Sequence, residues 1–510
     1  MKVNRIENTA TTDGGIDIDS SGNVTFDGVN IGRGAGDVAT NTAVGNNALD
    51  ANTTAAHNTA VGVSALTDCT TGGENTALGS NALANLTTGT HNVAVGFVAL
   101  DTVTTGDNNV AVGNEALQKN TTASDNTAVG FQALEENTTG TENVAVGSLA
   151  LDANTTGGNN TAVGSKSLGN NTGGGNTAVG RAALNANSSA DNNTAVGFNA
   201  MLDNTTGTEN VAIGSQVFYS NTTGNYNSVV GYKAFYSNTT GSECAANGYQ
   251  TLYNSTTGSK NTAVGWAALH NNTTASDNTA VGRAALFTNT TGHSNAALGK
   301  EALYNNTTAS NNTAVGLSAL YNNTTGSENT AFGKGAGVST TTGSGNVCIG
   351  FSADVGASFH SNSVVLGPSI TGKGSRTFFV SADSGVYHGG NTTTWSTTSD
   401  RRIKKNIADN NEGLSVINQI AVKNFEYKTA EEIETDGEVD SRDAVPKTGT
   451  QIGVIAQELQ GVRSSWVTTR ENGTLAVVGT DEILWHLVNS VQELSAENTA
   501  LKARLDAAGI

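Results

Sequence analysis

The segment TTSDRRIKKNI brings a hydroxyl group and a basic amine close together in the sequence, with Ser399 five residues before Lys404. A serine hydroxyl attacks a carbonyl only when a nearby base takes its proton, and a neutral lysine can serve as that base. Burial lowers the pKa of a lysine, and the neighbouring cations Arg401, Arg402 and Lys405 would lower it further. The spacing alone assigns no reaction, because a serine five residues before a lysine is too common a pattern to carry a function.

Other residues with reactive side chains are sparse. Cys69, Cys244 and Cys348 are too few and too scattered for a disulfide framework or a metal site, so we expect them to pack. Glycosidases need two carboxylates placed together, calcium-binding β-roll repeats need a G-G-x-G-x-D pattern, and neither is evident. The many Asn-x-Thr triplets match the glycosylation sequon, but we interpret them as Asn turns and stacked Asn ladders. We therefore expect no metal and no cofactor.

A strict repeat underlies most of the chain. The motif Asn-Thr/Val-Ala-Val/Ile/Leu-Gly contributes twenty glycines from Gly45 to Gly367, and eighteen of their nineteen intervals are 17 residues; the interval from Gly164 to Gly180 is 16. Each unit reads approximately G-x-x-A-L-x-x-N-T-T-G-x-x-N-T-A-V. It is too short for a helical hairpin, and its turns break helices. We predict a mainly β fold, a parallel β-solenoid with two extended pieces per turn, N-T-A-V and x-x-A-L.

Two apolar residues in succession, Ala-Val and Ala-Leu, indicate that both faces of each strand are buried, because neighbours along a strand point to opposite faces. One face can meet the interior of the coil, and the other most simply meets identical chains. We predict a homotrimer; the alternative is a wider single solenoid with both residues inside. Exposed aromatic decoration is expected directly after the repeat glycine, where Phe97, Phe131, Phe198, Tyr232 and Trp266 lie. Contact of these rings with a surface glycan is the alternative.

Composition excludes several classes of protein. Only 14 % of the 510 residues are charged and 5 % are aromatic, which argues for a fibrous architecture over several globular cores. The net charge of −19, without a basic block, excludes nucleic-acid binding through phosphate neutralisation. No run approaches 18 apolar residues and the N-terminus lacks a secretory signal, so we expect no membrane insertion and synthesis in the cytoplasm.

The composition changes near residue 400. Residues 400–510 carry 30 charged side chains, whereas the preceding 399 residues carry 39. We predict a separate α+β domain with a short helix and a strand over 412–427, a solvated acidic loop over 431–443 and a long helix over 481–506. Apolar residues three and four apart in this helix predict a trimeric coiled coil; the alternative is an amphipathic helix on a globular core. The coiled-coil positions are Leu484, Leu487, Val491, Leu494, Asn498, Leu501 and Leu505.

The repeats resemble the head domains of trimeric autotransporter adhesins, through matches such as NTAVG at 261–265 and NVAIG at 210–214. Those heads stack short units into left-handed parallel β-rolls that trimerise. The adhesins also need a signal peptide and a C-terminal membrane barrel, and neither is visible in this sequence. The resemblance therefore implies a fold and leaves the function open.

A second resemblance covers residues 396–503. TTSDRRIKKNI at 397–407, GLSVINQI at 413–420, NFEY at 424–427, GVIAQEL at 453–459 and VQEL at 491–494 resemble, in order, the intramolecular chaperone of phage endosialidases and tail-fibre proteins. The acidic loop and the DEILWHL segment depart from the usual pattern. The resemblance implies self-cleavage between Ser399 and Asp400 after assembly, with Ser399 as nucleophile and Lys404 as its base. This is a single-turnover serine endopeptidase activity, and we expect none on external substrates.

The predicted protein is a trimeric phage tail fibre or appendage of the virion, attached to the tail or baseplate by its N-terminus and to a host glycan or protein at its other end. The alternatives are a bacterial surface adhesin and an ice-binding solenoid. The predicted division is an attachment segment at 1–30, the solenoid at 31–367, a distal tip at 368–399 and the self-cleaved chaperone at 400–510. The tip groups candidate receptor-binding residues, although these would equally cap the last turn. They are Lys373, Arg376, Phe378, Phe379, Tyr387, His388 and Trp395.

Overall fold

The computed structural model consists of two compact units, Met1–Thr397 and Thr398–Ile510. The described residues of the first unit are 5–6, 16–18, 24–26, 29–380 and 386–389. Those of the second unit are 407–410, 412–429, 431–433, 448–469, 475–478 and 480–509.

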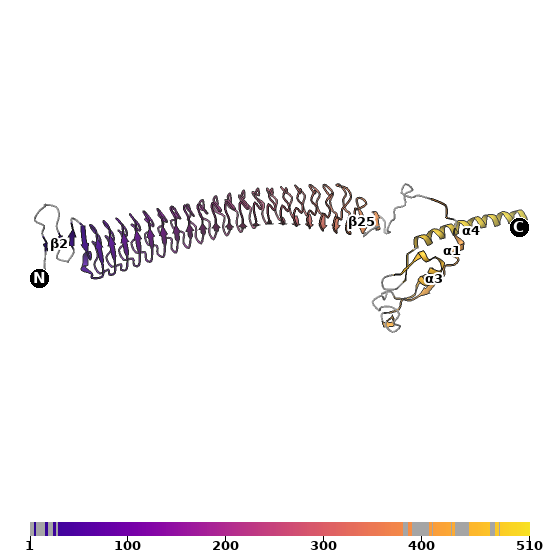
Figure 1. Ribbon diagram of the computed structural model, residues 1–510, viewed down its shortest axis with the longest axis horizontal. Helices are drawn as coiled ribbons and strands as arrows, with labels where there is room; N and C mark the ends of the chain where they lie inside the picture. Colours follow the sequence, from indigo (N-terminus) through magenta and orange to yellow (C-terminus); the bar gives the residue numbers. More distant parts are fainter. Residues whose placement is uncertain are drawn as a thin grey trace. The chain divides into compact units, whose positions relative to one another are not determined.

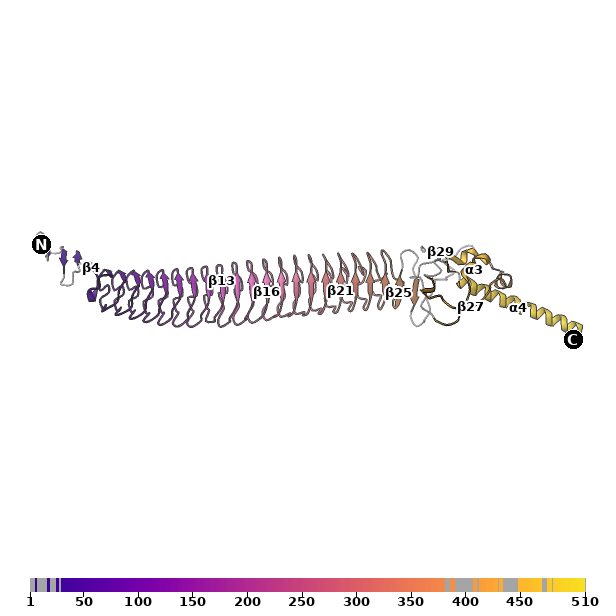
Figure 2. The same cartoon turned by 90° about the horizontal axis from the view of Figure 1, so that it is seen from below.

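The first unit is a β-solenoid rod with one short strand in each turn (Figures 1 and 2). Threonine and valine dominate these strands because their β-branched side chains suit an extended backbone. The strands are β5 Thr42–Val44, β6 Thr59–Val61, β7 Thr76–Leu78, β8 Val93–Val95, β9 Val110–Val112, β10 Thr127–Val129, β11 Val144–Val146, β12 Thr161–Val163, β13 Thr177–Val179, β14 Thr194–Val196, β15 Val211–Ile213, β16 Ser228–Val230, β17 Ala245–Asn247, β18 Thr262–Val264, β19 Thr279–Val281, β20 Ala296–Leu298, β21 Thr313–Val315, β22 Thr330–Phe332, β23 Val347–Ile349 and β24 Val364–Leu366. The predicted solenoid and its repeat are confirmed.

Successive strands pair in parallel and in register. Thr127 pairs with Val144, seventeen residues later, and the shift falls to sixteen between Thr161 and Thr177, where the sequence repeat is one residue short. The pairing continues outside the strands: the Leu66 N–H donates to the carbonyl of Ala82 at 3.0 Å. Because the middle residue of each strand points inward, alanines such as Ala128 form a buried column.

The segment x-x-A-L is a tight turn, so the prediction of a second strand there is wrong. Val98 and Leu100 have φ values of +59° and +52°, in the left-handed region, while Ala99 and Leu100 are both fully buried. A left-handed leucine costs about 1–2 kcal/mol. This cost is offset here because the turn places both apolar side chains inside the coil and lets the Leu100 N–H bond the carbonyl of Ala116 at 3.0 Å.

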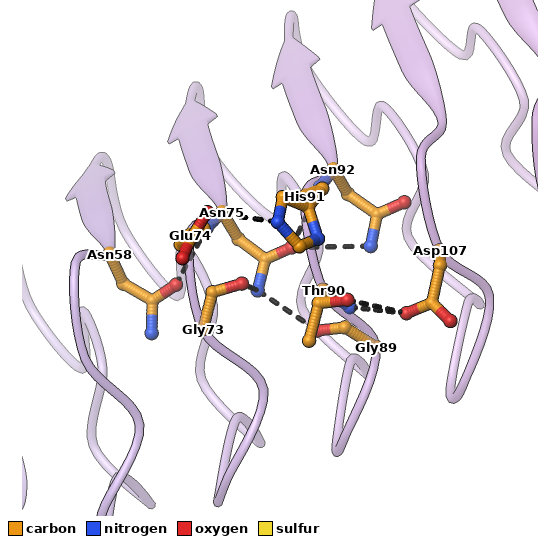
Figure 3. A network of polar contacts seen from close by, with 9 residues as sticks. All are labelled: Asn58, Gly73, Glu74, Asn75, Gly89, Thr90, His91, Asn92 and Asp107. Carbon is orange, nitrogen blue, oxygen red and sulfur yellow. Dashed lines mark hydrogen bonds and ion pairs between the residues drawn. The ribbon is translucent and has the colours of Figure 1, made fainter.

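Asparagine ladders run alongside the buried alanine and leucine core of the coil, and such stacked ladders are expected from the sequence. In Figure 3, the backbone N–H of Asn92 donates to the side-chain oxygen of Asn75 at 2.9 Å, and the Asn75 amide donates to the carbonyl of Gly89 at 3.0 Å. We call the asparagines immediately before the strands the strand ladder. A second column, the turn ladder, runs through the residue seven after each glycine, where Asn238 donates to Asn221 at 2.8 Å.

Interruptions of the turn ladder leave buried oxygens without a partner. The side-chain oxygens of Asn52, Asn154 and Asn323 accept no hydrogen bond. Asn52 is followed in its column by Cys69, Asn323 by Thr340, and Asn154 lies next to the turn that is one residue short. Where the ladder is intact the next turn supplies an amide donor, as Asn238 does for Asn221, and these three side-chain oxygens lack such a donor.

Antiparallel strands flank the rod. Strands β1 Arg5–Ile6, β2 Ile16–Ile18, β3 Val24–Phe26 and β4 Val29–Gly32 pair in sequence, and β4 pairs antiparallel with β5. At the other end, β25 Thr377–Val380 continues the parallel ladder from β24, and β26 Val386–Gly389 folds back against it. An antiparallel strand therefore covers the edge of the parallel ladder at each end, β4 at β5 and β26 at β25.

The second unit is a small α+β domain. It contains α1 Leu414–Ile417, β27 Lys423–Phe425, β28 Gln451–Gly453, α3 Ala456–Val462, η4 Ser464–Trp466, β29 Val467–Thr469, β30 Leu475–Val477 and α4 Thr480–Ala508. Its described core consists of Val416, Leu459, Trp466 and Val467 with partly buried neighbours. The predicted short helix and strand within 412–427 and the long terminal helix are confirmed; the acidic loop lies mostly outside the described residues.

Candidate functional site

The predicted cleavage residues, Ser399, Asp400 and Lys404, lie outside the described residues, and their roles stay predictions. The first described residue of the second unit is Ile407, which is 53 % exposed. The structure shows how the segment that follows, around residues 410–414, is bound to helix α4.

The segment after the predicted cleavage site is fastened to helix α4. The Asn489 amide donates to the carbonyl of Asn410 at 2.7 Å, and a ring nitrogen of His486 bonds the carbonyl of Glu412. The Leu414 N–H donates to a carboxylate oxygen of Glu493 at 2.8 Å. These contacts join residues more than seventy positions apart in the sequence, so α4 fixes the path of the chain that leads away from the predicted scissile bond.

A buried tryptophan packs against the same face of helix α4, with its ring 5.5 Å from that of His486. Trp466 is fully buried, and its indole N–H donates to the carboxylate of Glu482 on α4. The guanidinium of Arg463 lies 5.2 Å from the Trp466 ring centre and also pairs with Glu412. An indole N–H needs a partner when it is buried. The arrangement therefore ties η4, α4 and the segment around Glu412 into one cluster.

The predicted coiled-coil positions of α4 lie on a face that the described part of its own domain leaves uncovered. The exposed fractions are 53 % at Leu484, 59 % at Val491 and 46 % at Leu494, while His486 and Ser490, between them, are buried. Asn498 is exposed as well. Helix α4 thus uses one face for its own domain and presents a second, leucine-rich face outward.

The rod also presents an uncharged face of mixed threonine and aliphatic side chains, formed by the first and third residues of its strands. In β5–β24 no residue at these positions is charged. Among the more exposed apolar members, the exposed fraction runs from 36 % at Val112 to 58 % at Phe332. These members are Leu78, Val112, Val129, Val144, Val146, Val163, Val179, Val211, Ile213, Val264, Leu298, Phe332 and Ile349. We call this surface the strand face.

The predicted tip is only partly available for binding. Phe379 is 7 % exposed and pairs with Val365, so it continues the buried alanine column into β25. Lys373 and Arg376 are exposed, and the Lys373 ammonium lies 5.4 Å from the Phe379 ring centre. Phe378 is half-buried. Tyr387 and His388 belong to strand β26, and Trp395 lies outside the described residues.

Aromatic side chains on the flank of the rod are more ordered than the sequence suggested. The five rings directly after the repeat glycine are exposed as expected, and Tyr232, Tyr249 and Trp266 stack on one another. A second column, five residues after the glycine, was missed. It stacks seven rings at centre distances of 5.0–5.3 Å: Tyr219, Tyr236, Tyr253, His270, Phe287, Tyr304 and Tyr321. The seventeen-residue spacing of these aromatics was the available signal.

The three cysteines are buried and unpaired, as predicted for packing residues. Burial raises the pKa of Cys69 and Cys244 to about 11 and that of Cys348 to about 12. A thiol with such a pKa carries almost no thiolate at neutral pH, and the thiolate is the reactive form. None of the three is therefore suited to act as a nucleophile.

Two further features are absent from the part of the chain that the structure describes. Its residues contain no group of three or more His, Cys, Asp or Glu side chains able to hold a metal ion. Among its helices, none has the length and apolar content to cross a membrane.

Comparison with known proteins finds one family model that matches part of the chain. Residues 399–468 match the family model described as the chaperone of endosialidase, and this match begins at the predicted nucleophile. No curated protein and no solved structure shows significant similarity to the chain.

Proposed function

We propose that this protein is a trimeric fibre of a phage virion, whose C-terminal unit aligns three chains for folding and is then released by self-cleavage between Ser399 and Asp400. The observation that carries the proposal is the combination of a chaperone-family match over residues 399–468 with a solenoid rod that leaves a long uncharged face exposed. The proposed route is synthesis in the host cytoplasm followed by assembly into the virion.

The strand face supports self-association. A long uncharged surface with exposed valine, leucine, isoleucine and phenylalanine side chains favours burial against another protein. Identical chains present the same surface with the same spacing, so they can match one another turn for turn. Three rods packed along their strand faces would remove the exposed valines and leucines from water while leaving the charged turns outside.

The need for alignment follows from the repeat itself. Successive turns are so alike that a chain shifted by seventeen residues would form nearly the same contacts, and long parallel pairings fold slowly. The uncovered leucine face of α4 supplies a trimerising element outside the repeats. We infer that α4 sets the register before the rods pack, with Asn498 restricting the alignment as a polar residue at an a position.

Cleavage would make assembly irreversible. Ser399 and its target bond belong to the same chain, so proximity supplies much of the rate enhancement. Once the unit beginning at Asp400 has left, the element that guided folding is gone and the rod is held by its unfolding barrier. Host attachment at the tip rests on the exposed Lys373 and Arg376 together with the residues of 381–399.

Oligomer mass tests the trimer directly. Light scattering of the full-length protein should give three chains. Val163→Glu with Val179→Glu places charges on the strand face and should prevent compact rod packing, whereas the control pair Thr139→Glu and Thr156→Glu changes exposed turn residues and should leave the trimer intact. A monomeric wild-type chain, or equal behaviour of the two pairs, would refute the proposed arrangement.

Exchange of residues 368–399 with those of a related fibre tests the tip. Host range should change while trimer mass stays the same. Unchanged host range with normal assembly would remove the receptor role from this segment.

A further inference from the structure

We propose that the aromatic flank, defined by the stacked column Tyr219–Tyr321 and the adjoining residues Tyr232, Lys233, Tyr249, Trp266 and Arg283, binds an anionic polysaccharide along the rod. The proposal needs only a folded rod and is independent of how the chaperone acts. It concerns a different surface from the tip.

The geometry of the column decides what it can bind. Neighbouring rings are nearly parallel, with interplanar angles from 3° between Phe287 and Tyr304 to 18° between Tyr219 and Tyr236. Each inner ring therefore has both faces covered by the turns before and after it. A sugar cannot stack on these faces; it meets ring edges and the phenol hydroxyl groups.

Ring edges and phenols favour negative charge. The edge of an aromatic ring carries the positive part of its quadrupole, and a tyrosine hydroxyl is a hydrogen-bond donor. Five of the seven rings in the column are tyrosines. An extended row of such groups, repeated from one turn to the next, is complementary to a polymer that bears carboxylate or phosphate groups at short intervals.

Cations border both aromatic columns of the flank. The Lys233 ammonium lies 5.4 Å from the ring centre of Tyr232 and 5.6 Å from that of Tyr236, so it sits between the two aromatic columns. Arg283 lies 5.1 Å from the Trp266 ring centre. Arg283 and Lys300 share one carboxylate, that of Glu301, at 3.4 and 3.5 Å. The group of two cations and one carboxylate keeps a net positive charge.

The rest of the rod has the opposite character. Residues 45–213 contain fourteen Asp and Glu against three Lys and Arg, whereas residues 214–350 contain four against five. In four of the earlier turns the position of the aromatic column holds a carboxylate: Asp50, Asp101, Glu135 and Asp152. An anionic polymer is therefore repelled by the first part of the rod and accepted by the second.

The test measures retention of the full-length protein on immobilised polymers. A polyuronate and an alditol-phosphate polymer represent the two sources of negative charge, dextran is the neutral control, and double-stranded DNA represents a different class of polyanion. We expect retention on one or both anionic polysaccharides, loss of retention at high salt because exposed charges are screened, and none on dextran.

Variants replace flank residues by those that other turns carry at the same position. Lys233→Gln follows Gln132, Arg283→Ser follows Ser148, and Tyr253→Gln with Tyr304→Gln follows Gln118, so the fold is expected to tolerate them. Two exposed cation contacts together are worth about a fivefold loss of affinity, and the tyrosine pair about a further fivefold through lost hydrogen bonds. Phe131→Ser and Lys119→Gln, outside the flank, should change nothing.

Light scattering on every variant separates binding from assembly. A wild-type chain that fails to trimerise would refute the proposed fibre, yet retention would still test the flank. Equal binding of dextran, tighter binding of DNA than of both polysaccharides, or retention unchanged by the flank variants would overturn the inference. If the triple variant Lys233→Gln, Tyr253→Gln and Tyr304→Gln disturbs folding, the single variant Lys233→Gln is compared with the wild-type protein. The lysine ammonium lies at the surface, so this single change should leave the fold intact.

Discussion

The rod and the C-terminal unit solve the problem of stability in opposite ways. In the rod, each turn bonds the next through in-register strands and asparagine ladders, and the same contacts recur from β5 to β24. The described C-terminal unit has a four-residue buried core centred on Trp466 and joins distant parts of its sequence through single contacts such as that of Leu414 with Glu493.

The difference indicates a division of labour. Repetition gives the rod many equivalent contacts but no unique mark of register, because one turn resembles another. The C-terminal unit has few contacts, but each of them is unique, and its helix α4 presents an uncovered leucine face. A unit of this kind is suited to start assembly and to be dispensable afterwards.

Removal of the C-terminal unit has the largest expected effect. A gene that ends before residue 400 should yield aggregates or monomers, since nothing then aligns the repeats. Release of the unit after assembly, by self-cleavage or by a protease acting on the Ser399→Ala fibre, should leave a soluble trimer. The comparison is made by light scattering of both samples; a soluble trimer from the truncated gene would refute the chaperone role.

The next effect concerns the backbone of the rod. Gly214 follows strand β15 with φ +139°, and an added Cβ would lie 2.2 Å from the carbonyl oxygen of Gly231. Gly214→Ala should destabilise its turn by about 3 kcal/mol, because only glycine adopts this conformation readily. Hydrogen exchange across β15 and β16 measures the change.

Gly224→Ala is the matched control. Gly224 occupies the position ten after a repeat glycine, and an added Cβ there would also lie close to the next turn, 2.3 Å from the carbonyl oxygen of Gly241. Its φ is not left-handed, however, and alanine already occurs at the same position at Ala190 and Ala275. Its effect should be clearly smaller than that of Gly214→Ala. Equal protection in the two variants would show that the strand-end glycine is not required.

The asparagine ladders should give intermediate effects. Asn210 accepts both the backbone N–H and the side-chain amide of Asn227 at 3.0 Å, so Asn210→Ala leaves a buried backbone donor unpaired. We expect a loss of about 2 kcal/mol in local stability. Asn238→Leu in the turn ladder should cost less, because Leu86 and Val103 fill that column elsewhere. Hydrogen exchange at Asn227 and at residue 238 measures the two losses. A larger loss for Asn238→Leu than for Asn210→Ala would contradict this order.

Much of this architecture can be predicted from the sequence. The spacing of Gly45, Gly62 and their successors predicts the solenoid, and the Asn-x-Thr triplets predict the ladders, because both follow from stacking identical turns. The turn conformation of x-x-A-L could not be predicted. A leucine such as Leu100 adopts a left-handed backbone only when packing within the coil offsets the conformational cost. The tip assignment could not anticipate that Phe379 closes the alanine column.

The smallest expected effect is a pH dependence of the stability of the acidic first part of the rod. Desolvation by burial raises the pKa of Asp101, Asp152 and Asp203, so the folded rod binds their protons more tightly than the unfolded chain does. Their contribution to stability is fully present below the unfolded carboxyl pKa of about 4 and is lost as the pH rises through the folded pKa values. Thermal unfolding should show a small loss between pH 4 and pH 7 that the triple Asp→Asn variant lacks; an equal slope in the variant would contradict this assignment.

Intact-mass spectrometry of the expressed protein decides whether the chain cleaves itself at the start of its C-terminal unit. We predict two fragments, a fibre chain ending at Ser399 and a released chain of the 111 residues from Asp400 to Ile510. We also predict that Ser399→Ala and Lys404→Ala each give the full-length chain. A wild-type protein that stays intact after trimer assembly, or the same fragment pair from either variant, would contradict self-cleavage by these residues.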